Sequence, residues 1–178
     1  MKRLAVLISD AGTGTNLQAI IDAIETDKLK AKIAIVVSSS PDAFGLQRAK
    51  KNNISTIVVE KKDDLKKLLI DQQVDLIALA GWKLIIPQSL IDTFKNKILN
   101  LHPGLIPDTM NGVALNPDGT KGMWNRGGLT DVAIQNFLDK KATYAGSTVH
   151  FLSNEFDFGK ILNRCFEKIL PGDTVESI

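Results

Sequence analysis

The chain has 178 residues, of which 44% are hydrophobic and 24% charged, enough for one domain with a sizeable core. Its 22 basic and 20 acidic residues leave a net charge of +2, which gives no indication of binding to nucleic acid or to an anionic membrane. Cys165 is the only cysteine, so no intrachain disulfide can form, and with two histidines there is no cluster at metal-ligand spacing. We therefore expect a cytoplasmic protein without a metal, and since no run reaches about 18 apolar residues, without a membrane span.

Apolar runs alternate with amphipathic stretches along the chain. Runs of apolar residues predict strands over residues 4–8, 33–37, 54–59, 75–81, 98–102, 147–152 and 161–170. Apolar residues at spacings of three and four predict helices over residues 17–24, 41–52, 65–73, 89–96 and 129–138. Ser40 and Pro41 are expected to begin the second helix, and residues 173–176 have the pattern of one more helix start.

This alternation predicts an α/β fold, a doubly wound and mostly parallel sheet of about seven strands with helices on both faces. Residues 153–159 are too few for a helical crossover, so the C-terminal edge strand is expected to run antiparallel. We expect a single domain over residues 1–178. Residues 108–127 leave it as a turn-rich but partly apolar excursion, with a short hairpin around residues 116–119.

A glycine-containing loop, residues 10–16, joins the first strand to the first helix. Such a loop lets main-chain N–H groups approach a phosphate at the start of the helix, although a tight turn with Thr15 as N-cap explains the same residues. A dinucleotide site is excluded, because Leu17 stands where the third glycine of that motif belongs. The second strand also ends in serines, without an acid to hold a ribose.

The strand over residues 98–102 ends in polar side chains, which is typical of a strand that meets the carboxyl edge of a sheet. Asn100 and His102 are two residues apart and therefore share one face, where a donor and an imidazole can converge on one small reacting group. A polar strand end before the Pro103-Gly104 turn, with its side chains hydrogen-bonded, is the alternative.

Two further segments have apolar residues outside the strands and helices. The loop over residues 82–87 either packs under a helix or lines a pocket for a flat aromatic ligand. The excursion leaves from the strand that carries His102, so we expect it to be a lid with Trp124 as packing anchor and Arg126 as a contact to an anionic substrate. The alternative is an ordered loop packed on its own side chains.

Five motifs resemble the phosphoribosylglycinamide formyltransferase family of folate-dependent enzymes over essentially the whole chain. They are LIS…GTGTNLQAII, SSSPDAFGLQRA, LIALAGWKLIIP, ILNLHPGLIP and GSTVHFLSNEFDFGKIL. The resemblance implies formyl transfer from 10-formyltetrahydrofolate, as co-substrate, to the amine of phosphoribosylglycinamide in purine biosynthesis. It implies a Rossmann-like fold in a monomer or homodimer that binds small molecules, and a final helix that this chain does not reach.

The resemblance also assigns residues to roles. It places the substrate phosphate on residues of the first loop, Gly12, Thr13, Gly14, Thr15 and Asn16. It places the folate against Lys83, Leu84, Ile85, Asn100, Ser153, Asn154, Glu155 and Asp157. The implied catalytic residues are Asn100, His102 and Asp157, with His150 in support.

The chemistry of formyl transfer agrees with those residue types. An amine that attacks a formyl carbon passes through a tetrahedral oxyanion, for which Asn100 is the donor, while His102 moves the proton and Asp157 orients and charges His102. Taken alone, Asp157 is more simply a turn residue and His150 a core histidine; the joint pattern favours catalysis. The alternatives are a formyltetrahydrofolate hydrolase, a formyltransferase for another amine, and a non-catalytic folate- or nucleotide-binding module.

Overall fold

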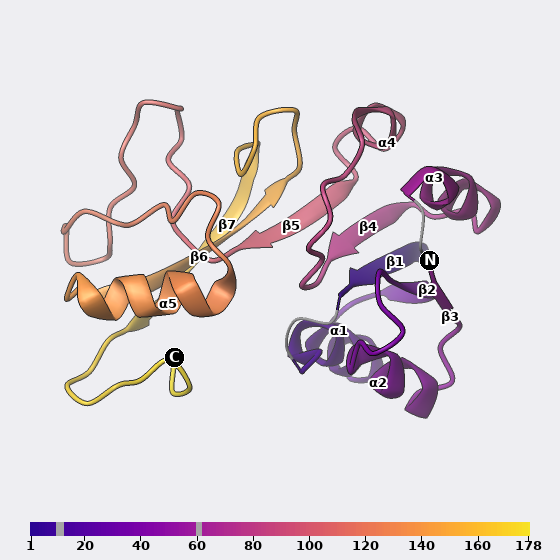
Figure 1. Ribbon diagram of the computed structural model, residues 1–178, viewed down its shortest axis with the longest axis horizontal. Helices are drawn as coiled ribbons and strands as arrows, with labels where there is room; N and C mark the ends of the chain where they lie inside the picture. Colours follow the sequence, from indigo (N-terminus) through magenta and orange to yellow (C-terminus); the bar gives the residue numbers. More distant parts are fainter. Residues whose placement is uncertain (10–12, 60–61) are drawn as a thin grey trace. The chain divides into compact units, whose positions relative to one another are not determined.

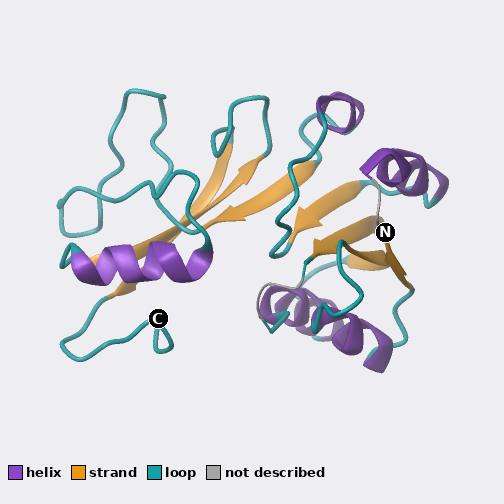
Figure 2. Ribbon diagram, in the orientation of Figure 1, coloured by secondary structure: helices purple, strands orange, loops and turns teal. Residues whose placement is uncertain are grey.

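Strands and helices alternate along the computed structural model, which describes residues 1–9, 13–59 and 62–178. Figure 1 shows these elements coloured along the chain, and Figure 2 separates helices, strands and loops. In the described residues the elements are β1 (Lys2–Ile8), α1 (Thr15–Glu25), β2 (Ala31–Ser38), α2 (Gly45–Lys51), β3 (Thr56–Val58), α3 (Lys62–Asp71), β4 (Leu76–Leu79), α4 (Gln88–Thr93), β5 (Ile98–His102), α5 (Thr130–Asp139), β6 (Tyr144–Phe151) and β7 (Ile161–Lys168).

The strands form one seven-stranded sheet in the order β3-β2-β1-β4-β5-β6-β7. β1 runs parallel to β2 and to β4, and β2 runs parallel to β3, whereas β6 and β7 are antiparallel. The prediction of a mostly parallel sheet with an antiparallel C-terminal edge strand is therefore confirmed.

The chain divides into two compact units, Met1–Leu99 and Asn100–Ile178. In the first unit, α1 and α2 lie on one side of the strands and α3 and α4 on the other (Figure 1), which is the doubly wound arrangement expected from the sequence. A single domain over residues 1–178 stays a prediction.

The core of the first unit is built on β1. Ala5, Val6 and Leu7 are fully buried, because a central parallel strand is covered on both faces. α1 adds Leu17 and Ile21, four residues apart on one helical face. The second unit repeats this pattern with Ala133 and Phe137 of α5, whose apolar face is buried at the same spacing.

Buried Thr148 of β6 fixes the chain just before the excursion. Its Oγ1 donates to the carbonyl of Gly104 at 2.6 Å and accepts from the N–H of Ile106 at 3.0 Å. Arg164 of β7 donates to the carbonyl of Ile106 and to the Asp108 carboxylate. Because both strands hold this stretch, the excursion begins from a fixed point.

The hairpin expected within the excursion is confirmed. Leu115 and Lys121 form an antiparallel bridge, and the N–H of Asn116 donates to the carbonyl of Thr120 at 2.9 Å. Gly119 has a φ of +82°, a conformation that glycine adopts without strain, so the turn residue suits the turn.

Two predicted helix starts are wrong. α2 begins at Gly45, not at Pro41, because the Ser40 hydroxyl accepts from the N–H of Asp42 and its carbonyl accepts from that of Ala43, which makes a separate turn. The segment over residues 173–176 is a turn, since the carboxylate of Asp173 accepts from Leu170, which precedes it, and so caps no helix.

Candidate active site

Three of the predicted catalytic side chains come from two neighbouring strands. β5 carries Asn100 and His102 at alternate positions, so both lie on one face of the strand. β6 carries His150, which is fully buried, and His102 is only 2% exposed. Buried imidazoles need hydrogen-bond partners. Each of these two histidines has a main-chain carbonyl as a partner, which determines the ring nitrogen that carries a proton.

Asn100 and His150 form a pair. Nδ2 of Asn100 lies 3.2 Å from Nε2 of His150, whose Nδ1 lies 3.1 Å from the carbonyl oxygen of Phe151. The carbonyl can only accept, so Nδ1 carries the proton and Nε2 accepts from the Asn100 amide. Burial lowers the pKa of His150 below its ordinary value, which agrees with this neutral tautomer.

His102 lies between a main-chain carbonyl and a carboxylate. Its Nε2 is 2.5 Å from the carbonyl oxygen of Trp124, and its Nδ1 is 3.7 Å from Oδ1 of Asp157. Because the carbonyl only accepts, Nε2 carries a proton. The distance from Nδ1 to Asp157 is that of an ion pair and too long for a direct hydrogen bond.

Asp157 is held in place through both its main chain and its side chain. Its φ of +48° is strained for a residue other than glycine. The indole N–H of Trp124 donates to its carbonyl at 3.0 Å, and the N–H of Gly127 donates to Oδ2 at 2.7 Å. With Oδ2 engaged in this way, Oδ1 is the oxygen that faces His102.

Two glycines allow the close packing around these side chains. A Cβ on Gly104 would lie 2.0 Å from the carbonyl oxygen of Trp124, the same oxygen that His102 contacts. A Cβ on Gly159 would lie 2.0 Å from the carbonyl oxygen of Phe151, which pairs with His150. Larger residues at either position would displace a carbonyl that orients a histidine.

The loop after β6 contains four of the folate-binding residues expected in the second unit, Ser153, Asn154, Glu155 and Asp157. The hydroxyl of Ser153 accepts from the N–H of Glu155 and donates to the carbonyl of Phe158 at 2.6 Å, which closes the loop on itself. Phe156 at its tip is 59% exposed, so the loop presents an aromatic ring.

In the first unit, Gly14 and the residues after it begin α1. Gly14 precedes the helix with a φ of +74°, and a Cβ there would lie 2.8 Å from the Cα of Gly45. Thr15 is the first helical residue rather than the N-cap, so the alternative of a Thr15 cap is wrong. Thr13 and Asn16 flank this helix start, and Gly12 lies outside the described residues.

Arg48 of α2 supports the same loop. Its Nε donates to the carbonyl of Thr13 at 2.8 Å, and its Nη1 donates to the side chain of Gln18 at 3.2 Å. The first N–H groups of an α-helix have no partner within the helix, so α1 begins with donors beside a fixed guanidinium. An anion is the ligand that such a helix start favours.

The loop after β4 contains the residues of the first unit that are expected to bind folate, Lys83, Leu84 and Ile85. The N–H of Lys83 donates to Oγ of Ser9 at 3.0 Å, and Ser9 and Ser39 share a hydrogen bond of 2.7 Å. Leu84 and Ile85 are exposed. The apolar loop does not pack under a helix at these two positions, which leaves them available to a flat ring.

The structure thus brings together Asn100 with His150 and His102 with Asp157, all within the second unit. It adds contributions that the sequence did not indicate, of which the main-chain groups of Trp124 and Gly127 are the clearest. Trp124 is confirmed as a packing anchor, with its ring 5.9 Å from that of Phe158. Arg126, expected to contact substrate, lies over the Trp124 ring and donates to the carbonyl of Phe156.

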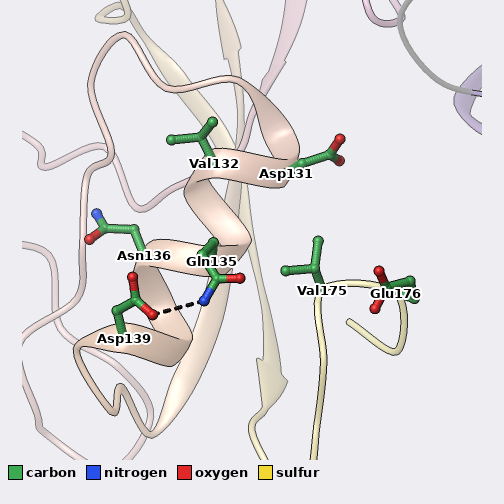
Figure 3. Close-up of a pocket in the computed structure, with 7 residues that line it drawn as sticks. All are labelled: Asp131, Val132, Gln135, Asn136, Asp139, Val175 and Glu176. Carbon is green, nitrogen blue, oxygen red and sulfur yellow. Dashed lines mark hydrogen bonds between the residues drawn. The ribbon is translucent and has the colours of Figure 1, made fainter.

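A separate cavity of about 590 Å³ lies in the second unit between α5 and the chain near its end (Figure 3). Its lining residues are Asp131, Val132, Gln135, Asn136, Asp139, Val175 and Glu176. Three of these are carboxylates, which repel an anionic ligand, and none belongs to the predicted site. The cavity is therefore separate from the predicted catalytic residues.

Neither a metal-binding cluster nor a membrane-spanning helix is found among the described residues. These residues hold no group of three or more histidine, cysteine, aspartate or glutamate side chains arranged around one ion. Over the same ranges, no helix combines the length and the apolar character that crossing a bilayer takes.

Comparison with known proteins gives concordant results. The formyl transferase family matches residues 2–178. A phosphoribosylglycinamide formyltransferase from Haemophilus influenzae is 36% identical, over 100% of this chain and 78% of its own length. One from Dictyostelium discoideum is 34% identical, over 98% of this chain and 87% of its own length.

Solved structures agree with the sequence relatives. The crystal structure of glycinamide ribonucleotide transformylase 1 from Symbiobacterium toebii superposes with a TM-score of 0.80 at 32% identity, covering 99% of this chain and 78% of that one. The resemblance inferred from the five motifs is confirmed.

Proposed function

Because the chain belongs to the formyl transferase family, we propose that it transfers the formyl group of 10-formyltetrahydrofolate to the amine of phosphoribosylglycinamide, a step of purine biosynthesis. The relatives that match over nearly the whole chain support this substrate, since they bear the name phosphoribosylglycinamide formyltransferase. The observation that carries the proposal is the pairing of His102 with Asp157 at the end of the strand that also holds Asn100.

In this reaction the amine attacks the formyl carbon and a tetrahedral oxyanion forms. Asn100 has two N–H groups on Nδ2; His150 accepts from one, and the other donates to the oxyanion. Neutral His150 thereby holds the amide with its nitrogen toward the reacting centre. An amide turned the other way would present an oxygen, which repels the oxyanion.

Proton movement completes the transfer. The attacking amine loses a proton as its bond to the formyl carbon forms, and N10 of the folate gains one as its bond to that carbon breaks. His102 carries this proton and Asp157 stabilises the imidazolium, since it is the carboxylate that faces Nδ1. The products are the formamide of phosphoribosylglycinamide and tetrahydrofolate.

Binding residues complete the proposal. The substrate phosphate binds Gly12, Thr13, Gly14, Thr15 and Asn16, which lie at and before the start of α1. The folate contacts residues 83–85 in the first unit and Asn100 and residues 153–157 in the second. We also propose that the enzyme acts in the cytoplasm as a monomer or homodimer.

The test is an assay of tetrahydrofolate formation with and without phosphoribosylglycinamide. We expect turnover that depends on this substrate and yields one formylated product per tetrahydrofolate. Folate turnover without any amine would instead identify a hydrolase, and turnover with a different amine only would assign another transferase. Folate binding without turnover, in an otherwise folded protein, would favour a binding module.

A further inference from the structure

The segment Trp124–Gly127, at the end of the excursion, contacts His102 and Asp157 through main-chain atoms and the indole of Trp124. The carbonyl of Trp124 accepts from His102, its indole N–H donates to Asp157, and the N–H of Gly127 donates to the Asp157 carboxylate. His102 therefore contacts this segment through Trp124, and Asp157 contacts it through Trp124 and Gly127.

The segment is itself firmly held. Nδ2 of Asn125 donates to the carbonyl of Pro103 at 3.2 Å, and its Oδ1 accepts from Asn136 of α5 at 2.7 Å. Arg126 donates to the carbonyl of Phe156 at 3.0 Å. The segment thus contacts three separate parts of the second unit, and these contacts fix its position independently of His102.

The carbonyl of Trp124 limits the chemistry of His102. A carbonyl oxygen only accepts, so Nε2 keeps its proton whether the ring is neutral or charged. Nδ1 is then the nitrogen that gains and loses a proton, and the 3.7 Å to Asp157 leaves it without a direct hydrogen bond that would hold that proton.

We propose, on the basis of the proposed function, that Trp124–Gly127 is a positioning element that fixes His102 as the Nε2–H tautomer, so that Nδ1 exchanges the proton in formyl transfer. The same element sets Asp157 with Oδ1 toward that nitrogen. Trp124 and Gly127 are positioning residues, because they act through His102 and Asp157.

Gly104 offers a way to move a main-chain carbonyl by mutation. Its Cβ would lie 2.0 Å from the carbonyl oxygen of Trp124, so Gly104→Ala must shift that oxygen away from its present place. The second variant, Trp124→Phe, removes the donor to Asp157 and keeps a ring beside Phe158. Leu115→Ala is the matched control, since this exposed residue lies in the same excursion but outside Trp124–Gly127.

The first measurement is the tautomer of His102 by correlation of its ring nitrogens and carbon-bound hydrogens in NMR. The sequence has two histidines, so the signals that vanish in His102→Gln identify His102. We expect the Nε2–H tautomer in the neutral ring of the wild type and a mixture of tautomers in Gly104→Ala. An Nδ1–H tautomer in the wild type would overturn the proposal.

The second measurement is kcat for formyl transfer. We expect Gly104→Ala to lose about 100-fold, the effect of displacing a catalytic group by about 1 Å. Trp124→Phe should lose roughly fivefold in kcat, the effect of one neutral hydrogen bond. In this variant His102 should keep the Nε2–H tautomer. Leu115→Ala should change neither quantity.

Folded Gly104→Ala with an unchanged tautomer and kcat would reject the positioning role. Should this variant not fold, the wild-type tautomer and Trp124→Phe decide the question. The tautomer is measured without substrate, so it stands even when the chain proves to act on another amine, which separates a failure of this inference from a failure of the proposed function.

Discussion

The amide nitrogen of Asn100 lies 3.2 Å from Nε2 of His150, so the buried histidine orients the Asn100 amide. His150 can accept from Asn100 only while it is neutral. Its lowered pKa, caused chiefly by burial, keeps it neutral near pH 7. Near pH 7, His150 on β6 can therefore accept a hydrogen bond from Asn100 on the neighbouring β5.

Loss of the Asn100 amide should affect the transition state more than binding. We expect Asn100→Ala to lower kcat by on the order of 100-fold or more, the effect of removing one oxyanion donor, with little change in the KM for folate. Steady-state kinetics measure both. The control is Asn163→Ala on exposed β7, which should behave as wild type. An equal loss in both variants would contradict the role of Asn100.

The pairing of His102 with Asp157 predicts that their mutations are not independent. His102→Gln should lower kcat on the order of 100-fold to 10,000-fold, the range for general acid–base catalysis. Asp157→Asn should also lower kcat, and the double variant should be no slower than His102→Gln alone. A double-mutant cycle on kcat measures this coupling. Additive losses would show that Asp157 acts without His102.

Burial of His150 makes stability depend on pH. Its pKa in the folded protein lies below the ordinary value of the unfolded chain, so the unfolded chain binds more protons between the two values. This contribution to the free energy of unfolding is complete above about pH 6.5 and falls as the pH decreases toward the folded-state pKa.

Urea unfolding at about pH 7.5 and about pH 5 measures the effect. The wild type should lose more stability between these values than His150→Asn, in which nothing titrates at that position. Carboxylates common to both proteins cancel in the comparison. Equal losses in the two proteins would show that His150 titrates alike in the folded and unfolded states.

Gly14 and Gly119 separate backbone strain from crowding. Both have a positive φ, +74° and +82°, but a Cβ meets Gly45 at 2.8 Å in one case and nothing within 4 Å in the other. We expect Gly119→Ala to destabilise by about 1 kcal/mol, the cost of strain alone. Gly14→Ala should cost more and raise the KM for phosphoribosylglycinamide, because the start of α1 must shift. Equal free energies of unfolding would refute the crowding.

Features that follow from side-chain periodicity could be predicted from the sequence. The two-residue spacing of Asn100 and His102 placed them on one face of a strand, and the short link of residues 153–159 predicted an antiparallel edge. The seven strands and the glycine loop before α1 follow from the same kind of pattern.

Features that depend on main-chain atoms could not be predicted from the sequence. Every residue has a main-chain carbonyl, and every residue except proline has a main-chain N–H. No side-chain pattern therefore marks the carbonyl of Trp124 or the N–H of Gly127. The start of α2 was misplaced for a related reason: Ser40 is equally suited to a helix cap and to a local turn, and the choice depends on the backbone that follows.

The two fixed ends of the excursion have a consequence for how this part of the chain can change. Thr148 and Arg164 hold residues 104–108, and contacts to His102, Asp157 and α5 hold residues 124–127. The hairpin between them closes mainly through its own hydrogen bonds, such as those of Asn116 with Thr120. Insertions and deletions in that hairpin should therefore leave His102 where it is, and natural variation in length can accumulate there at little cost.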